Sequence, residues 1–144
     1  MDKNLTKAQT LVEIEKRLVK AKIAKSYVFT VNDWKQSKTN VIEKIQKIFN
    51  HNLIIIRSSA LREDGKYSSM AGAFESVKNI NSSDFKSIKL GVSKVISSYG
   101  KRADNRDEIL IQRMIDDVSM SGVVFTHELN HGSPYYVINY DDVS

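Results

Sequence analysis

The feature that most constrains this chain is a run of aliphatic residues that ends on an arginine. Leu53 to Ile56 are four consecutive aliphatic residues, a pattern typical of a strand buried on both faces. Arg57 follows, and residues 58–72 are rich in serine, alanine and glycine. Arginine offers a planar fork of donors, and glycines let backbone N–H groups approach phosphate oxygens. The spacing fits an anion-binding loop, and it equally fits a plain hairpin loop in which Arg57 pairs with Glu63 or Asp64.

Apolar residues at helical spacing predict helices on both sides of this strand. The predicted helices span residues 6–20 with Thr6 as N-cap, residues 40–50, and about 84–99, where Asn81 to Asp84 supply caps and Gly100 a stop. In the second of these, Val41, Ile45 and Ile48 or Phe49 are expected to point inward; in the third, the apolar stripe is Phe85, Ile88, Val92, Val95 and Ile96. A short turn that carries Trp34 is expected to be capped by Asn32 or Asp33.

Extended segments are predicted at residues 27–30, 73–80, 109–115, 118–126 and 135–139. Asp116–Asp117 has the composition of a turn, so residues 118–126 are expected to form a hairpin with residues 109–115. The polar stretch 101–108 is expected to be a mobile surface loop. The alternation of strands and helices favours an α+β fold with a mixed sheet.

Composition narrows the function class. The chain has 144 residues, enough for one domain, and no cysteine, which excludes disulfides and thiolate metal sites and favours a cytoplasmic location. No apolar run is long enough to span a bilayer, and the N-terminus lacks a signal-peptide pattern, so no membrane partner is expected. The net charge is +5, but the lysines are interleaved with acidic residues, so nucleic acid is not an expected partner.

Four segments in order resemble one known family. They are TKAQTL (6–11), RSSALREDGKYSSMAGAFESV (57–77), ILIQRMI (109–115) and SGVVFTHELNHGSPYYVINYDD (121–142). Together they resemble the nucleotide-binding N-terminal domain of phosphoenolpyruvate synthases and pyruvate phosphate dikinases. The resemblance implies an ATP-grasp-like fold with a largely antiparallel mixed sheet and about three helices.

The resemblance also implies a nucleotide site. Arg57 matches an arginine that contacts the phosphates, and Lys7 matches a lysine that reaches them from the opposite side. The loop that covers the phosphates corresponds to Ser68, Ser69, Met70, Ala71 and Gly72. Gln112 and Met114 match the strand beside the adenine.

The implied cofactors are ATP and Mg²⁺, and the implied reaction is phosphorylation of a histidine on a downstream domain for transfer to pyruvate or a similar acceptor. Asp141 and Asp142 lie near the family's acidic positions that help hold nucleotide and metal. The downstream phosphohistidine and pyruvate-binding domains are absent from residues 1–144. We therefore expect a partial, truncated ATP-binding domain that is inactive alone.

The sequence departs from the family pattern at one place. His127 and Glu128 stand where many members have an arginine-containing segment. This departure leaves open an alternative, a noncatalytic nucleotide-binding or protein-interaction module on the same scaffold. The sequence leaves the oligomeric state unknown, and an exposed strand edge at residues 135–140 is a candidate for self-association.

Overall fold

A computed structural model of the chain describes residues 5–60 and 75–142. The chain divides into two compact units, Met1–Met114 and Ile115–Ser144. The predicted phosphate-covering loop, residues 68–72, lies outside the described residues, as do Glu63 and Asp64.

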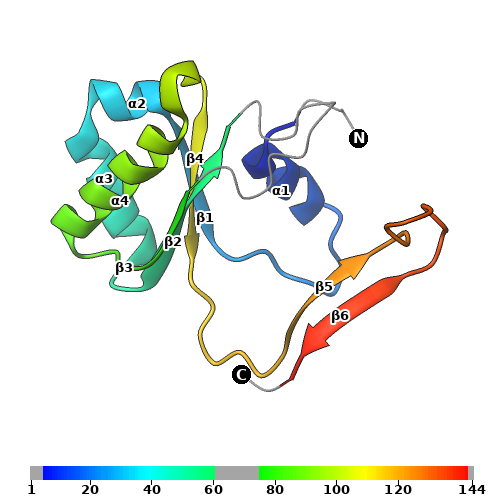
Figure 1. Cartoon of the computed structure of the whole chain (residues 1–144). Coiled ribbons are helices and arrows are strands. Elements are labelled where there is room, and N and C mark those ends of the chain that lie inside the picture. Colours follow the sequence, from blue (N-terminus) through cyan, green and yellow to red (C-terminus); the bar gives the residue numbers. More distant parts are fainter. Residues whose placement is uncertain (1–4, 61–74, 143–144) are drawn as a thin grey trace. The chain divides into compact units, whose positions relative to one another are not determined.

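The first unit holds four α-helices and a four-stranded sheet in its described part (Figure 1). Its elements are α1 (Lys7–Glu15), β1 (Ser26–Thr30), α2 (Val31–Gln36), α3 (Lys38–Phe49), β2 (Leu53–Ser59), β3 (Ser76–Asn81), α4 (Phe85–Ser98), a 3₁₀ turn (Gly100–Arg102) and β4 (Glu108–Arg113). The second unit holds the hairpin of β5 (Ser121–Phe125) and β6 (Val137–Asp141). The α+β class is confirmed, with four helices instead of about three.

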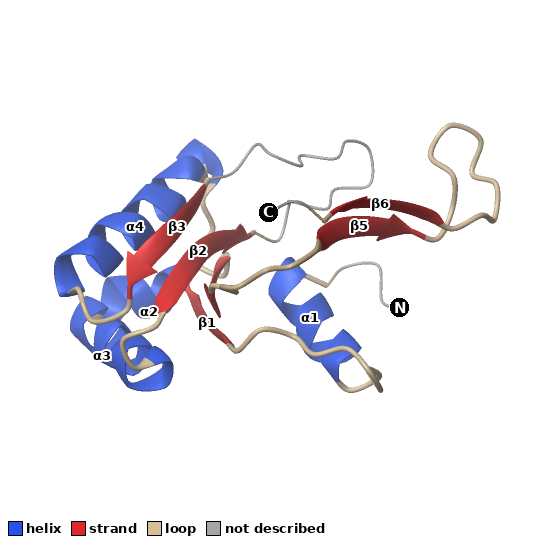
Figure 2. Cartoon of the chain, turned by 90° about the horizontal axis from the view of Figure 1, so that it is seen from below, coloured by secondary structure: helices blue, strands red, loops and turns tan. Residues whose placement is uncertain are grey.

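The sheet order is β1-β4-β2-β3, and every neighbouring pair is antiparallel. Helices α3 and α4 cover one face, whereas α1 lies on the other (Figure 2). The hydrophobic core fills the space between the sheet and α2–α4, and its fully enclosed members include Ile42, Ile45, Ile54, Ile56, Ile88, Val92, Ile109 and Ile111. The described part contains no helix long and apolar enough to cross a membrane.

Burial of β2 on both faces was a wrong expectation. Ile54 and Ile56 are fully buried against the helices, but Leu53 is 47% exposed and Ile55 is half-buried. The sheet is antiparallel and carries its main core on one face, so the side chains of β2 alternate between core and the α1 side. Arg57, one residue after Ile56, therefore lies on the α1 side of the sheet.

The predicted hairpin between residues 109–115 and 118–126 was also wrong. Strand β4 ends at Arg113 and pairs with β1 on one edge and β2 on the other, so neither edge remains for β5. Strand β5 pairs with β6 instead. The prediction relied on the closeness of the two segments in the sequence, whereas the partners of β4 come from the distant strands β1 and β2.

Helix ends agree with the capping chemistry more closely than with the apolar spacing. Thr6 caps α1 through a capping box with Gln9, as predicted, but α1 ends at Glu15 rather than near residue 20. The N-cap of α2 is Thr30, and Asp33 is its capping-box partner rather than the cap. Asp84 caps α4 as predicted.

Gly100 ends α4 in the left-handed region, with φ +64°, as the sequence indicated. Phe85, expected on the buried stripe of α4, is 40% exposed. In α3, Val41, Ile45 and Phe49 are buried as predicted.

The structure departs from the sequence-based expectation in the polar loop and in β3. Within the predicted polar loop 101–108, Asp107 is buried, and its Oδ2 accepts a hydrogen bond from the Asp104 N–H at 2.7 Å. In β3, which lies in the extended segment predicted at residues 73–80, side chains do not alternate strictly. Asn79 has φ +58° and the pairing with β2 shifts register, so Val77 and Ile80 both pack on the core.

Candidate functional site

The α1-facing side of the sheet carries a group of polar side chains. Directly opposite residues of antiparallel strands share a face, and the register pairs Arg57 with Leu110, Ser59 with Glu108 and Ile55 with Gln112. These positions alternate with Ile54 and Ile56, which face the helical core. Arg57, Ser59, Glu108 and Gln112 therefore all lie on the side of the sheet that α1 occupies.

Arg57 and Gln112 contact each other across the β2–β4 ladder. Arg57 Nη1 donates a hydrogen bond to Gln112 Oε1 at 3.1 Å, and Gln112 is only 8% exposed. A guanidinium carries five N–H donors, so this bond orients the group while leaving donors for an anion. The structure brings together two of the residues that the sequence predicted for the site.

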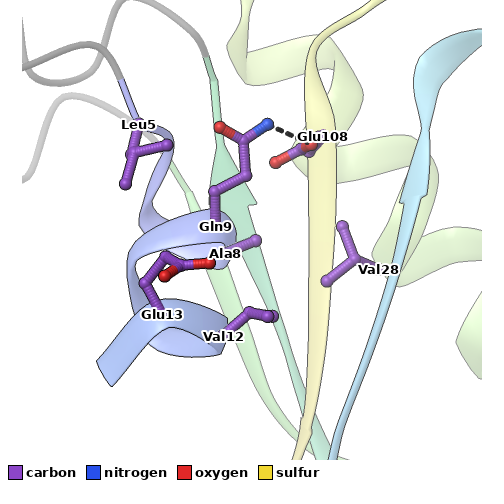
Figure 3. Close-up of a pocket in the computed structure, with 7 residues that line it drawn as sticks. All are labelled: Leu5, Ala8, Gln9, Val12, Glu13, Val28 and Glu108. Carbon is purple, nitrogen blue, oxygen red and sulfur yellow. Dashed lines mark hydrogen bonds between the residues drawn. The ribbon is translucent and has the colours of Figure 1, made fainter. Parts of the chain in front are cut away.

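The N-terminal end of α1 is tied to the same face. The Ala8 N–H donates to Ser59 Oγ at 2.9 Å. Thr6 Oγ1 donates to one oxygen of the Glu108 carboxylate. Gln9 Nε2 donates to the other at 3.1 Å, the bond drawn as a dashed line in Figure 3. Lys7, the first residue of α1, thus stands between two residues that are bonded to the sheet.

A tyrosine joins the ends of β2 and β4 beneath this contact. The Tyr99 hydroxyl accepts a hydrogen bond from the Ser59 N–H at 3.3 Å and donates one to the Glu108 carbonyl oxygen at 2.6 Å. Tyr99 and Ser59 are both buried. Sequence reasoning missed Ser59, Tyr99 and Glu108 as contributors, and the one available signal was the position of Ser59 two residues beyond Arg57.

A cavity of about 290 Å³ lies between α1 and the β1–β4 side of the sheet (Figure 3). Its lining is mainly apolar and consists of Leu5, Ala8, Gln9, Val12, Glu13, Val28 and Glu108. Helix α1 therefore contacts the sheet incompletely along this side.

Comparison with known families gives this geometry a context. The model of the family described as "Pyruvate phosphate dikinase, AMP/ATP-binding domain" matches residues 4–140. The chain belongs to this family. No curated protein and no solved structure matched the chain.

The match to the pyruvate phosphate dikinase AMP/ATP-binding family spans α1, the whole four-stranded sheet and most of the hairpin. It confirms the family resemblance found in the sequence and supports ATP as the ligand. Lys7, Arg57 and Gln112 all lie within the matched residues. Their separate roles remain predictions.

The remaining predicted residues lie at the end of β4 and in the second unit. The Met114 N–H donates to the Leu53 carbonyl oxygen at 2.9 Å, which extends the β2–β4 pairing by one bond beyond Arg113. Asp141 is the last residue of β6, Asp142 follows it, and both are exposed. Within the described ranges, no three histidine, aspartate or glutamate residues gather as a metal-binding group.

Proposed function

We propose that this domain binds MgATP on the α1 side of its sheet, with Lys7 and Arg57 contacting the phosphates. Residues 68–72 cover the phosphates in this proposal, and Gln112 and Met114 lie near the adenine. The observation that carries it is the placement of Arg57, held by Gln112, on the same sheet face as the Lys7-bearing helix. The family match supplies the ligand class.

These residue types suit phosphoryl transfer. The reaction needs positioning and stabilisation of negative charge more than covalent chemistry, and fixed cationic donors provide both. Arg57 presents a preoriented fork, whereas Lys7 presents a compact charge from a helix end. Both groups strengthen binding of the triphosphate and favour the charge that develops as the phosphoryl group leaves.

The proposed protein ligands for Mg²⁺ are the carboxylates of Asp141 and Asp142, in the second unit. Both side chains are exposed carboxylates, which are hard oxygen ligands of the kind that Mg²⁺ takes. Mg²⁺ commonly keeps several waters and uses one or two carboxylates plus substrate phosphates, so it needs no larger protein cluster. When bound, the ion neutralises part of the phosphate charge.

The proposed acceptor is a histidine on another domain, which passes the phosphoryl group to pyruvate or a similar acceptor. In this step the P–O bond to the leaving nucleotide breaks, the nucleotide keeps the electron pair of that bond, and the phosphoryl group bonds to a ring nitrogen of that histidine. Support for this part comes from the family alone. ATP binding without any transfer to such a histidine would instead favour a nucleotide-sensing module on the same scaffold.

Calorimetric titration with MgATP tests the binding proposal. Arg57→Ala is expected to weaken binding by about tenfold or more, because a hydrogen bond to a charged group is worth about 1.5–3 kcal/mol. Arg113→Ala is the matched control, since Arg113 is the last residue of β4 and its register partner is Ile54, on the core side of the sheet. Equal affinities for wild type and Arg57→Ala, or equal losses in both variants, would contradict the proposal.

A further inference from the structure

Apolar packing alone does not fix the position of α1. Within this helix, all of which the structure describes, Ala8 is the one buried residue, and Val12 is 49% exposed. The cavity of about 290 Å³ lies along its side (Figure 3). A helix of nine residues with so small a buried face has little to hold it in one place.

Hydrogen bonds hold the N-terminal end of α1 instead. We use "clasp" for the three bonds from Thr6 and Gln9 to Glu108 and from Ala8 to Ser59. Thr6, Ala8 and Ser59 are each 2% exposed or less, so their bonds are shielded from competing water. Hydrogen bonds are directional, and the clasp therefore sets where this end of the helix lies on the sheet.

The clasp brackets Lys7. Thr6 and Ala8, its two chain neighbours, are both bonded to the sheet, and Ser59 is two residues beyond Arg57 on the same face of β2. The clasp thus fixes the backbone of Lys7 relative to the strand that carries Arg57. Tyr99 adds rigidity because its hydroxyl joins Ser59 to Glu108.

We propose that Glu108 and Ser59 are positioning residues, which act through the clasp to hold Lys7 where it meets the phosphates of a bound nucleotide. This inference rests on the proposed function. Neither residue needs to touch the nucleotide itself. Glu108 is the more informative of the two, because its removal leaves the capping box of Thr6 and Gln9 intact.

Electrostatics alone predicts the opposite effect of removing Glu108. The Glu108 carboxylate lies on the same side of the sheet as Arg57 and the Lys7-bearing helix, so it repels an anionic ligand bound there. By Coulomb interaction alone, the loss of this negative charge would tighten ATP binding. If the clasp positions Lys7, the loss of Glu108 weakens ATP binding despite the favourable change in charge. The sign of the effect separates the two accounts.

The test is MgATP calorimetry on Glu108→Ala, Lys7→Ala and the double variant. Glu108→Ala is expected to weaken binding by about three- to tenfold, the size of one net hydrogen bond. The double variant is expected to bind no more weakly than Lys7→Ala, because positioning has no effect once the lysine is gone. Asp84→Ala, which removes the cap of α4 and no clasp bond, is the control for general destabilisation and is expected to keep wild-type affinity.

Hydrogen exchange without nucleotide provides the second readout. The Ala8 and Gln9 amides are expected to exchange faster in Glu108→Ala and in Ser59→Ala than in wild type. Tighter or unchanged ATP binding in Glu108→Ala, or losses that add in the double variant, would overturn the positioning role. If the wild type binds no MgATP, the proposed function is refuted. Faster exchange in the variants would then show that the clasp holds α1 on the sheet but has no role in nucleotide binding.

Discussion

Arg57 on β2 donates a hydrogen bond from Nη1 to the amide oxygen of Gln112 on β4, at 3.1 Å. The bond runs diagonally, since the direct partner of Arg57 is Leu110 and that of Gln112 is Ile55. It turns the guanidinium along the α1 side of the sheet. The neutral amide orients Arg57 without neutralising its charge, which is what an anion site requires.

Replacement of this amide by a carboxylate is expected to weaken nucleotide binding. In Gln112→Glu the new carboxylate forms an ion pair with Arg57 and repels the phosphates. We expect MgATP affinity to fall by about tenfold or more, in line with about 1.5–3 kcal/mol for a charged hydrogen bond. Gln46→Glu adds the same charge on α3, where Gln46 bonds to the Ser83 carbonyl, and should change affinity little. Wild-type affinity in Gln112→Glu would show that Arg57 does not meet the phosphates.

Loss of the Ser59 hydroxyl is expected to destabilise the first unit. Ser59→Ala leaves the buried Ala8 N–H without its acceptor, which costs about 1–3 kcal/mol of unfolding free energy. Denaturant unfolding measures this change. Ser97→Ala, at an exposed position on α4, is expected to stay within about 0.5 kcal/mol of wild type. A similar small change in Ser59→Ala would mean that the Ala8 bond contributes little.

Gly91 permits the close approach of α4 to β2. A Cβ at this position would lie 2.7 Å from Ile56 Cδ1, and Ile56 is fully buried. Gly91→Ala is therefore expected to destabilise by about 1–3 kcal/mol from overpacking, less the gain in helix propensity of about 1 kcal/mol.

A second substitution tests that explanation, because Ile56→Val removes the clashing Cδ1 atom. The double variant Gly91→Ala with Ile56→Val is expected to be more stable than the sum of the two single changes predicts. Strict additivity in denaturant unfolding would argue against the contact.

The cap of α4 makes stability depend on pH. The Ser87 hydroxyl, with the backbone N–H groups of Ser87 and Lys86, holds the pKa of Asp84 below its ordinary value of 3.8. A carboxyl with a lowered pKa in the folded state stabilises the protein at pH values above its unfolded pKa. That contribution is lost as the pH falls through the folded pKa.

Asp84→Asn isolates this contribution, since asparagine also caps helices but does not titrate. The wild type is expected to exceed the variant in unfolding free energy above about pH 5, and the difference should shrink below pH 3.8. The comparison requires denaturant unfolding at several pH values. A difference that stays constant down to the acid limit would be inconsistent with a lowered pKa at Asp84.

Local signals predicted individual elements well. The aliphatic run at residues 53–56 marked β2, and the hydroxyl and carboxyl caps at Thr6 and Asp84 marked the starts of α1 and α4. The family segments also led to the family that the comparison shows. Each of these signals lies within a few neighbouring residues.

Pairings between distant residues were not predictable in the same way. Arg57 and Gln112 are separated by 55 positions, and their contact depends on the register of β2 against β4. Period-two patterns show which residues share a face of one strand, but not which strand lies beside it. For the same reason, the sequence suggested β5 as the partner of β4 and gave no sign of the Glu108 clasp.

The most direct test of the ATP site is an NMR titration of the isotopically labelled chain with MgATP, which follows backbone amides and arginine Nε–H groups. The account predicts that the largest shift changes occur at the Arg57 Nε–H and at the amides of Lys7, Ala8 and Ser59, and that they saturate together. Saturable changes confined to other parts of the chain, with these four signals unmoved, would contradict a phosphate site on the α1 side of the sheet.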